Sequence, residues 1–250
     1  MLQTVIRLLQ KIKRDKLARY RHHFNWLATW LYYDPDVYMI PKHSIDYIVV
    51  DGLKYRYDGC SDGIVRQNSA FFQGVLHGDI ALDIGANIGD VAIPLSRLCT
   101  KVVAVEPLYA KKLLQNIIVN EIGNIAVIDA ALADKPTPEY RVACQGRSAI
   151  VKGITFRSML TAAGNVNFLH VDAEGAAWCI NKEDCAGIRE MRFEFHLWRR
   201  NFKKYKQLYN DWLIWLSQNG YRVEVSRSPL SSTVDFRELW NVAAHKISGL

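Results

Sequence analysis

A glycine turn with acidic neighbours carries the strongest chemical signal in this sequence of 250 residues. Gly85 and Gly89 follow a short apolar run, the pattern of a tight turn between a strand and a helix. Free N–H groups at such a helix start bind carboxylates or phosphates. Because Asn87 and Asp90 stand where a dinucleotide loop needs glycines, the pyrophosphate fingerprint fails. The turn instead suits an aminoacyl-sulfonium ligand, with an acid such as Asp83 for its ammonium group.

Two further acids fall where neighbouring strands should end. Glu106 closes the apolar run 101–105, and Asp129 closes the run 124–128. A carboxylate at the end of the second strand accepts hydrogen bonds from both ribose hydroxyls in nucleoside-binding sheets. Asp129 is then placed to accept a hydrogen bond from an adenine amino group. Together with the glycine turn, these acids predict a nucleoside cofactor site.

A third group of residues provides acid–base chemistry. A sulfonium gives up its methyl group by in-line displacement, and an alcohol acceptor must also lose a proton to a base or a metal-bound oxygen. Asp172, Glu174, Glu194 and His196 follow two later predicted strands, so they should share one edge of the sheet. Histidine titrates near neutral pH, and Asp172 or Glu194 could orient His196 or share a divalent ion with it. The alternative is a histidine packed beside Trp198 and a Glu174 that favours a helix start.

The elements that must position these residues alternate between strand and helix from residue 79 onward. This alternation predicts a mostly parallel sheet with helices on both faces and a ligand site at the carboxyl ends of the strands. Pro136, Pro138 and Gly146 predict a looser connection between the two halves. The predicted strands are 79–84, 101–105, 124–128, 167–171, 191–195, 221–226 and 239–244, and the predicted helices are 90–99, 108–121, a short one from about 175, and 201–218.

The first 78 residues are predicted to form an extension to a domain that spans 79–250. Asp51-Gly52 between two apolar runs predicts a β-hairpin. Upstream, apolar residues recur at helical spacing with basic residues opposite, so we expect an amphipathic helix, or two, ending near Asp34-Pro35. We expect this element to pack on the domain. The alternatives are contact with an anionic membrane surface through residues 1–33, or with a polyanion.

The positive charge is concentrated at the N-terminus. The chain has a net charge of +7, and residues 1–21 hold seven Lys and Arg against one Asp. The nearly neutral remainder makes nucleic acid an unlikely partner, although a basic run at 199–206 would suit either a solvated helix start or an acidic acceptor. Five cysteines without a C-x-x-C pair fit neither a disulfide framework nor a zinc site. With no signal-peptide pattern and no apolar run of membrane-spanning length, we expect a cytoplasmic protein.

Several blocks of the sequence resemble the FkbM-type S-adenosylmethionine-dependent methyltransferases. The resemblance covers about residues 75–200 and implies a class I methyltransferase-like α/β fold with a seven-stranded, mostly parallel sheet. It also implies S-adenosylmethionine as cofactor and O-methylation of a sugar or small metabolite. The blocks are Ala81–Asp90, Val105–Pro107, Gln115–Asn120, Asp129–Leu132, Leu169–Gly175 and Phe193–His196.

The resemblance also assigns residues to the site. Three positions depart from the family pattern: Arg157 and Ala177 stand where acids are common, and His170 stands where a lysine is usual. Arg157 and Ala177 leave open a membrane-peripheral nucleoside-binding protein without turnover, and the basic N-terminal face with the run 199–206 leaves open an RNA acceptor. The expected cofactor residues are Asp83, Gly85, Ala86, Asn87, Gly89, Glu106, Asp129 and Ala130, and the expected catalytic residues are His196, Asp172, Glu174 and Glu194.

Overall fold

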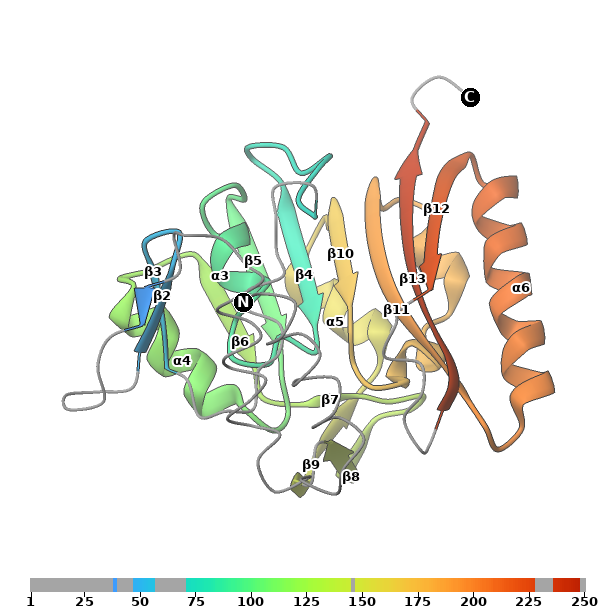
Figure 1. Ribbon diagram of the computed structural model, residues 1–250, viewed down its shortest axis with the longest axis horizontal. Helices are drawn as coiled ribbons and strands as arrows, with labels where there is room; N and C mark the ends of the chain where they lie inside the picture. The colour runs from blue at the N-terminus through green and yellow to red at the C-terminus, as the bar shows by residue number, and fades with distance from the viewer. Residues whose placement is uncertain (1–37, 40–46, 57–70, 145–146, 228–235, 248–250) are drawn as a thin grey trace, which may run out of the picture.

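The computed structural model describes residues 38–39, 47–56, 71–144, 147–227 and 236–247. Within these ranges, the main sheet has seven strands in the order β12-β13-β11-β10-β4-β5-β6 (Figure 1). The strands are β4 (Ile80–Ile84), β5 (Lys101–Val105), β6 (Ile125–Ile128), β10 (Phe168–Val171), β11 (Glu190–Trp198), β12 (Tyr221–Arg227) and β13 (Phe236–Lys246).

All strands of the described main sheet except β13 run in one direction. β4, β5, β6, β10 and β11 pair in parallel, whereas β13 pairs antiparallel with both β11 and β12. This is a methyltransferase-like α/β fold, as predicted. The chain leaves β4 toward β5 on one side and later returns to β10 on the other side. The order therefore reverses between β4 and β10, where ligands of such sheets bind at the carboxyl ends of the strands.

Helices cover both faces of this sheet. Successive strand residues point to opposite faces, so Leu82 and Ile84 pack in the core formed with α5 and α6, whereas Ala81 packs in the core formed with α3 and α4. The two cores hold the β4 end rigidly between them. The helices are α3 (Ala92–Leu95), α4 (Ala110–Val119), α5 (Phe156–Ala163) and α6 (Phe202–Gln218), and the 3-10 helices η2 (Ala176–Cys179) and η3 (Lys182–Cys185) follow β10.

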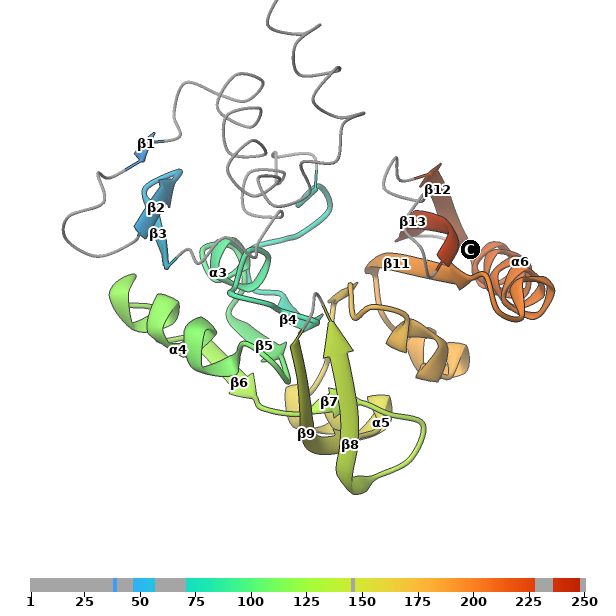
Figure 2. The same cartoon turned by 60° about the horizontal axis from the view of Figure 1, so that its bottom comes forward.

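A second sheet lies beside the carboxyl ends of the central strands (Figures 1 and 2). In it, β7 (Ala131–Leu132) pairs parallel with β9 (Arg147–Ile154), and β9 pairs antiparallel with β8 (Thr137–Cys144). The prediction of a loose connection here is wrong. Pro138 lies within β8 where the register with β9 is irregular, a position at which a strand tolerates proline.

The hairpin predicted at Asp51-Gly52 is confirmed. β2 (Tyr47–Val50) and β3 (Leu53–Arg56) are antiparallel, and β1 (Tyr38–Met39) extends the sheet beside β2. Both turn residues have positive φ, 49° and 73°, as a tight two-residue hairpin requires. The predicted amphipathic helix before the hairpin lies outside the described residues and stays a prediction.

Two asparagines fasten β3 to α4. Asn116 Oδ1 accepts a hydrogen bond from the Arg56 N–H at 2.7 Å, and Asn120 Oδ1 accepts one from the Lys54 N–H at 2.8 Å. Residues four apart lie on one face of a helix, so Asn116 and Asn120 both reach the same edge of β3. The Asn-x-x-x-Asn pattern is therefore structural in this chain.

The predicted helices and strands differ from those in the structure mainly in the residues at which they begin and end. The helix expected over 90–99 is regular only at α3, and the strand expected over 191–195 continues to Trp198 because β13 keeps pairing with it. In the part of the chain that the structure describes, no helix combines the length and apolar character needed to cross a membrane.

Candidate functional site

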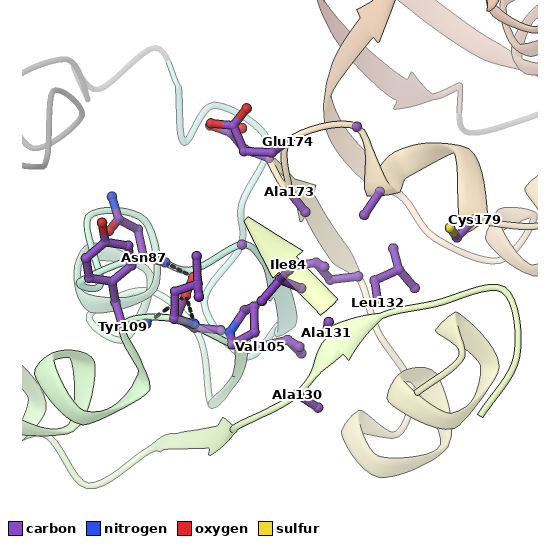
Figure 3. Close-up of a pocket in the computed structure, with 18 of the residues that line it drawn as sticks. Ile84, Asn87, Val105, Tyr109, Ala130, Ala131, Leu132, Ala173, Glu174 and Cys179 are labelled. Atoms are coloured by element: carbon purple, nitrogen blue, oxygen red, sulfur yellow. Dashed lines mark hydrogen bonds between the residues drawn. The ribbon is translucent and has the colours of Figure 1, made fainter. Parts of the chain in front are cut away.

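A cavity of about 450 Å³ opens at the carboxyl ends of β4, β5 and β10 (Figure 3). The glycine turn after β4 and the loop after β5 form one side, and the turn after β10 forms another. β7 and residues 140–143 of β8 complete the wall. The cavity thus lies where the strand order reverses, which is the position predicted for a ligand.

The glycine turn approaches the opposite wall without a side chain in between. Gly85 has φ 87°, and a Cβ there would lie 1.9 Å from the carbonyl oxygen of Asp172. Gly89 has φ 101°, and a Cβ there would lie 2.7 Å from Ile93 Cδ1. Gly85 and Asn87 line the cavity, whereas Ala86 and Gly89 are buried beneath the turn. The glycines are therefore required by close packing as well as by backbone conformation.

Glu106 joins the glycine turn to the loop after β5. Its Oε2 accepts the Asn87 N–H at 2.8 Å, and its Oε1 accepts the N–H groups of Leu108 and Tyr109 at 2.6 and 2.9 Å (Figure 3). Burial raises the pKa of Glu106 although these three donors act to lower it. The carboxylate lies in the cavity wall, and three of its roughly four acceptor positions are used by backbone.

Asp83 does not reach the cavity. Its side chain is 0% exposed, and its Oδ1 lies 2.7 Å from Nδ1 of His170, the residue opposite it in the β4–β10 pairing. Among the described residues, Asp83 Oδ2 has no hydrogen-bond partner. His170 itself lines the cavity and packs edge-on against Phe71. The structure therefore places a histidine between the predicted acid and the cavity.

Asp90 is the acid of this turn that lines the cavity. Burial, followed by the negative charge of Asp83, raises the pKa of Asp90 to about 7. In the sequence, Asp90 breaks the dinucleotide fingerprint and begins a predicted helix, but it is not among the predicted cofactor residues. Its position directly after Gly89, at the start of the helical segment, is the signal that could have identified it.

Of the two residues predicted on the adenine side of the site, only Ala130 lines the cavity. Ala130 lines the cavity together with Ala131 and Leu132, whereas Asp129 is exposed and lies outside the wall. The reason is that β6 ends at Ile128 and the chain then turns toward β7. The assignments of Ala130 and Asp129 to a cofactor stay predictions.

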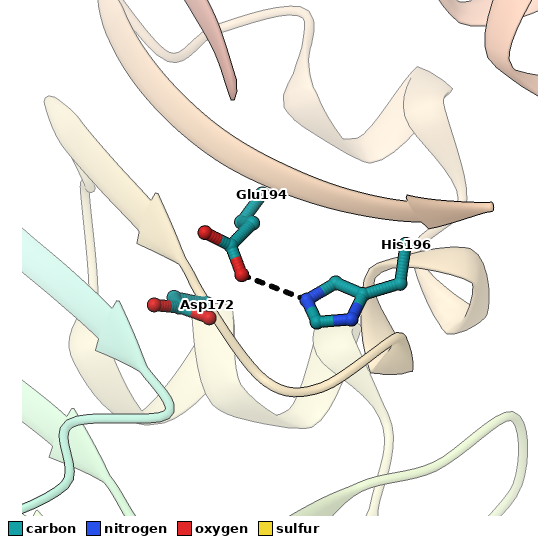
Figure 4. A group of neighbouring side chains, drawn as sticks. All are labelled: Asp172, Glu194 and His196. Atoms are coloured by element: carbon teal, nitrogen blue, oxygen red, sulfur yellow. Dashed lines mark hydrogen bonds and ion pairs between the residues drawn. The ribbon is translucent and has the colours of Figure 1, made fainter. Parts of the chain in front are cut away.

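The four predicted catalytic residues form one cluster. His196 Nε2 lies 2.8 Å from Glu194 Oε1 (Figure 4). On the other side of the ring, His196 Nδ1 lies 3.6 Å from Glu174 Oε2. Asp172 and Glu174 line the cavity, whereas Glu194 and His196 lie behind them. His196 is 2% exposed, so the predicted base does not itself face the cavity.

The pKa values of Asp172 and Glu194 in this cluster are shifted in opposite directions. Burial, Glu194 and Glu174 raise the pKa of Asp172 well above its usual range. Burial acts to raise the pKa of Glu194 as well, but hydrogen bonds from His196 and Asp172 outweigh it and lower that pKa. Their mutual hydrogen bond raises the pKa of Asp172 and lowers that of Glu194.

The departures from the family pattern fall in different places. Arg157 is exposed and pairs with Asp184 at 2.6 Å, and Ala177 is buried in the core, so neither lines the cavity. His170 does line it. Sequence reasoning missed Tyr140 and Arg141 of β8 and Trp198 after the end of the predicted strand, because it predicted neither the β8–β9 hairpin nor the full length of β11.

No protein-family model and no curated protein matches this chain. Among solved structures, TYW2 from M. jannaschii in complex with AdoMet is 13% identical over 84% of this chain and 93% of that chain, with a TM-score of 0.49. A Streptococcus mutans protein in complex with SAH is 13% identical over 70% and 94%, with a TM-score of 0.48. An rRNA methylase from Streptococcus thermophilus is 11% identical over 71% and 93%, with a TM-score of 0.47. Similarities this weak give no information about the reaction that this chain performs.

Proposed function

We propose that this chain is an S-adenosylmethionine-dependent methyltransferase of the FkbM type that methylates a hydroxyl group of a sugar or other small metabolite. The observation that carries the proposal is the cavity at the β4–β10 switch point, where a bare glycine turn lies between the carboxylates of Asp90 and Glu106. S-adenosylmethionine has an ammonium, a carboxylate and a ribose diol near one another. The spacing of Asn116 and Asn120, together with Asp172-x-Glu174-Gly175, supports the narrower family assignment.

The residues in the wall fit each part of this cofactor. Asp90 would hold the ammonium, with the unpartnered Asp83 Oδ2 as a second buried negative atom beside the turn. Backbone N–H groups of the turn would bind the carboxylate. Glu106 keeps about one acceptor position for a ribose hydroxyl. When bound, the cofactor supplies an electrophilic methyl group.

The acceptor side is formed by the turn after β10. Glu174 is 44% exposed at its side chain and lines the cavity, so its carboxylate can meet an acceptor hydroxyl and take the proton. His196 Nδ1, 3.6 Å behind Glu174 Oε2, orients that carboxylate and shares the proton. In this arrangement His196 acts through Glu174 and does not touch the acceptor. For in-line displacement, Glu174 would have to hold the acceptor oxygen in line with the methyl group that the bound cofactor would supply.

Calorimetric titration of the full chain with S-adenosylhomocysteine tests the cofactor site. We expect one micromolar site that Glu106→Gln weakens about tenfold or more, because charged hydrogen bonds contribute about 1.5–3 kcal/mol. Glu139→Gln, an exposed carboxylate on β8, is the matched control and should bind normally. A folded wild type that does not bind this ligand would refute the proposal.

Incubation with methyl-labelled cofactor tests the acceptor class. The acceptors are a panel of sugars, other small hydroxylated metabolites and total RNA, and the products are identified by mass spectrometry. We expect label in a hydroxylated small molecule. Label confined to RNA would contradict the proposed acceptor while leaving the cofactor site intact.

A further inference from the structure

Asp172, Glu194 and His196 converge on one point behind the cavity wall (Figure 4). Each offers one ligand atom, and the three atoms lie within 4.8 Å of one another. The register explains the convergence: Val171 of β10 is paired with Phe193 of β11, so the next residues, Asp172 and Glu194, lie side by side. His196 follows on the same face of β11, two residues later.

A second Glu–His pair, between Glu190 of β11 and His245 of β13, shows what is unusual about the Glu194–His196 pair. Glu190 Oε2 lies 2.6 Å from His245 Nδ1 and 3.4 Å from Arg192 Nη1, so an arginine compensates its buried charge. Among the described residues, no Arg or Lys forms a salt bridge with Asp172 or Glu194. The cluster thus places two partly buried carboxylates together without the fixed cation that the Glu190–His245 pair has.

The surroundings of His196 also suit a ligand role. Nε2 points at Glu194, 2.8 Å away, and Nδ1 faces Glu174 Oε2 at 3.6 Å. A histidine that ligates a metal through Nε2 carries its proton on Nδ1, where a carboxylate commonly accepts it and fixes the ring. Glu174 stands in that position.

We propose that Asp172, Glu194 and His196 bind one divalent cation at the acceptor side of the cavity. Two carboxylates and one imidazole suit Mg²⁺ or Mn²⁺. Asp172 lies in the cavity wall, so an ion held there would have its open coordination positions accessible from the cavity.

The role of the ion rests on the proposed function. A cation here would bind the acceptor oxygen and favour its deprotonated form, with the proton passing to Glu174. An acceptor with two neighbouring oxygens, such as a sugar diol, would occupy two of the open positions. The inference therefore narrows the acceptor to a hydroxyl that lies next to a second oxygen atom.

Titration of the metal-free full chain with Mn²⁺, followed by electron paramagnetic resonance and calorimetry, tests the site. We expect one ion per chain, competition by Mg²⁺, and a nitrogen coupling from one histidine in the spin-echo spectrum. Glu194→Gln should weaken binding at least about tenfold, because it removes a charged ligand. Glu190→Gln, the same change in the Glu190–His245 pair, should leave Mn²⁺ binding unchanged.

The wild-type spectrum keeps the test decisive if either variant fails to fold. Absence of stoichiometric binding into the millimolar range, or binding without a histidine nitrogen coupling, would overturn the metal site. So would equal binding by wild type and a folded Glu194→Gln variant. Titration of the same preparation with S-adenosylhomocysteine separates the two ideas, since that ligand can bind while Mn²⁺ does not, and the reverse.

Discussion

Replacing Gly85 with alanine should destabilise the protein through two separable effects. The residue has φ 87°, and the added Cβ would lie 1.9 Å from the Asp172 carbonyl oxygen and 2.6 Å from its carbonyl carbon. An unfavourable backbone conformation costs about 1–3 kcal/mol, and overpacking costs about a further 1–3 kcal/mol. Both contacts are with backbone atoms, so no side-chain rotation relieves them. The expected total is about 2–6 kcal/mol, against a typical stability of about 5–15 kcal/mol.

Two other glycines provide the comparison: one isolates the backbone cost, and the other is a control with neither cost. Gly164 also has a positive φ, 95°, but an added Cβ there meets nothing within 4 Å, so Gly164→Ala should show the backbone cost alone. Gly187 has neither a left-handed φ nor a neighbour within 4 Å, so Gly187→Ala should change stability by less than about 1 kcal/mol.

Thermal melts of the three variants provide the assay. At about 2–4 °C per kcal/mol for a chain of this size, Gly85→Ala should lower Tm by about 5–20 °C and Gly164→Ala by about 2–10 °C. Gly85→Ala should also weaken S-adenosylhomocysteine binding, because relief of the clash moves the turn away from Asp172. Equal losses of stability in Gly85→Ala and Gly164→Ala would show that the close approach between the turn and Asp172 is not present.

Two further predictions concern Asp90 and the Asp83–His170 pair. Because the pKa of Asp90 is raised from 3.8 to about 7, the wild type loses stability as pH rises from about 4 to about 7, so Asp90→Asn should be more stable than wild type at about pH 8 and match it only below about pH 4. Asp90→Asn should also bind S-adenosylhomocysteine more weakly. In the wild type, the affinity for this ligand should decrease as the pH is lowered below about 7, because Asp90 takes up its proton. A calorimetric affinity that is constant from about pH 6 to 8 would contradict this. Removing one partner of the buried Asp83–His170 pair should cost about 3–5 kcal/mol in urea unfolding, with the double variant Asp83→Ala/His170→Ala no worse than either single one. Additive losses would show that the two residues are not coupled.

Much of the architecture was predictable because it depends on local patterns. Alternating apolar runs and helical segments predicted the parallel strands, and Asp51-Gly52 predicted the hairpin, since both signals are set by neighbours in sequence. The β8–β9 hairpin was missed because Pro136 and Pro138 favour a loop locally. Pairing with β9 at an irregular register position overrides that preference.

The placement of the site residues was less predictable. The sequence assigned Asp83 to the cofactor, but Asp83 and His170 are partners in the β4–β10 register, so their side chains lie on one face of the sheet and pair with each other. Asp90, a few residues later, is the acid that lines the cavity. Register between strands 87 residues apart is set by the packing of both sheet faces, which a local pattern does not contain.

By itself, the sequence determined which residue types stand at the ends of the strands and that glycines are needed after β4. An acid that directly follows a strand of a parallel sheet lies at the carboxyl edge of that sheet, independently of the rest of the fold. Tertiary structure alone decided which of those acids face the cavity and which face one another. On β11, Glu190 and Glu194 each have a partner two residues later on the same strand, Arg192 and His196, and the sequence contains both pairs. The partners from other strands are His245 of β13 for Glu190 and Asp172 after β10 for Glu194, and they depend on strand pairing between residues far apart in the chain.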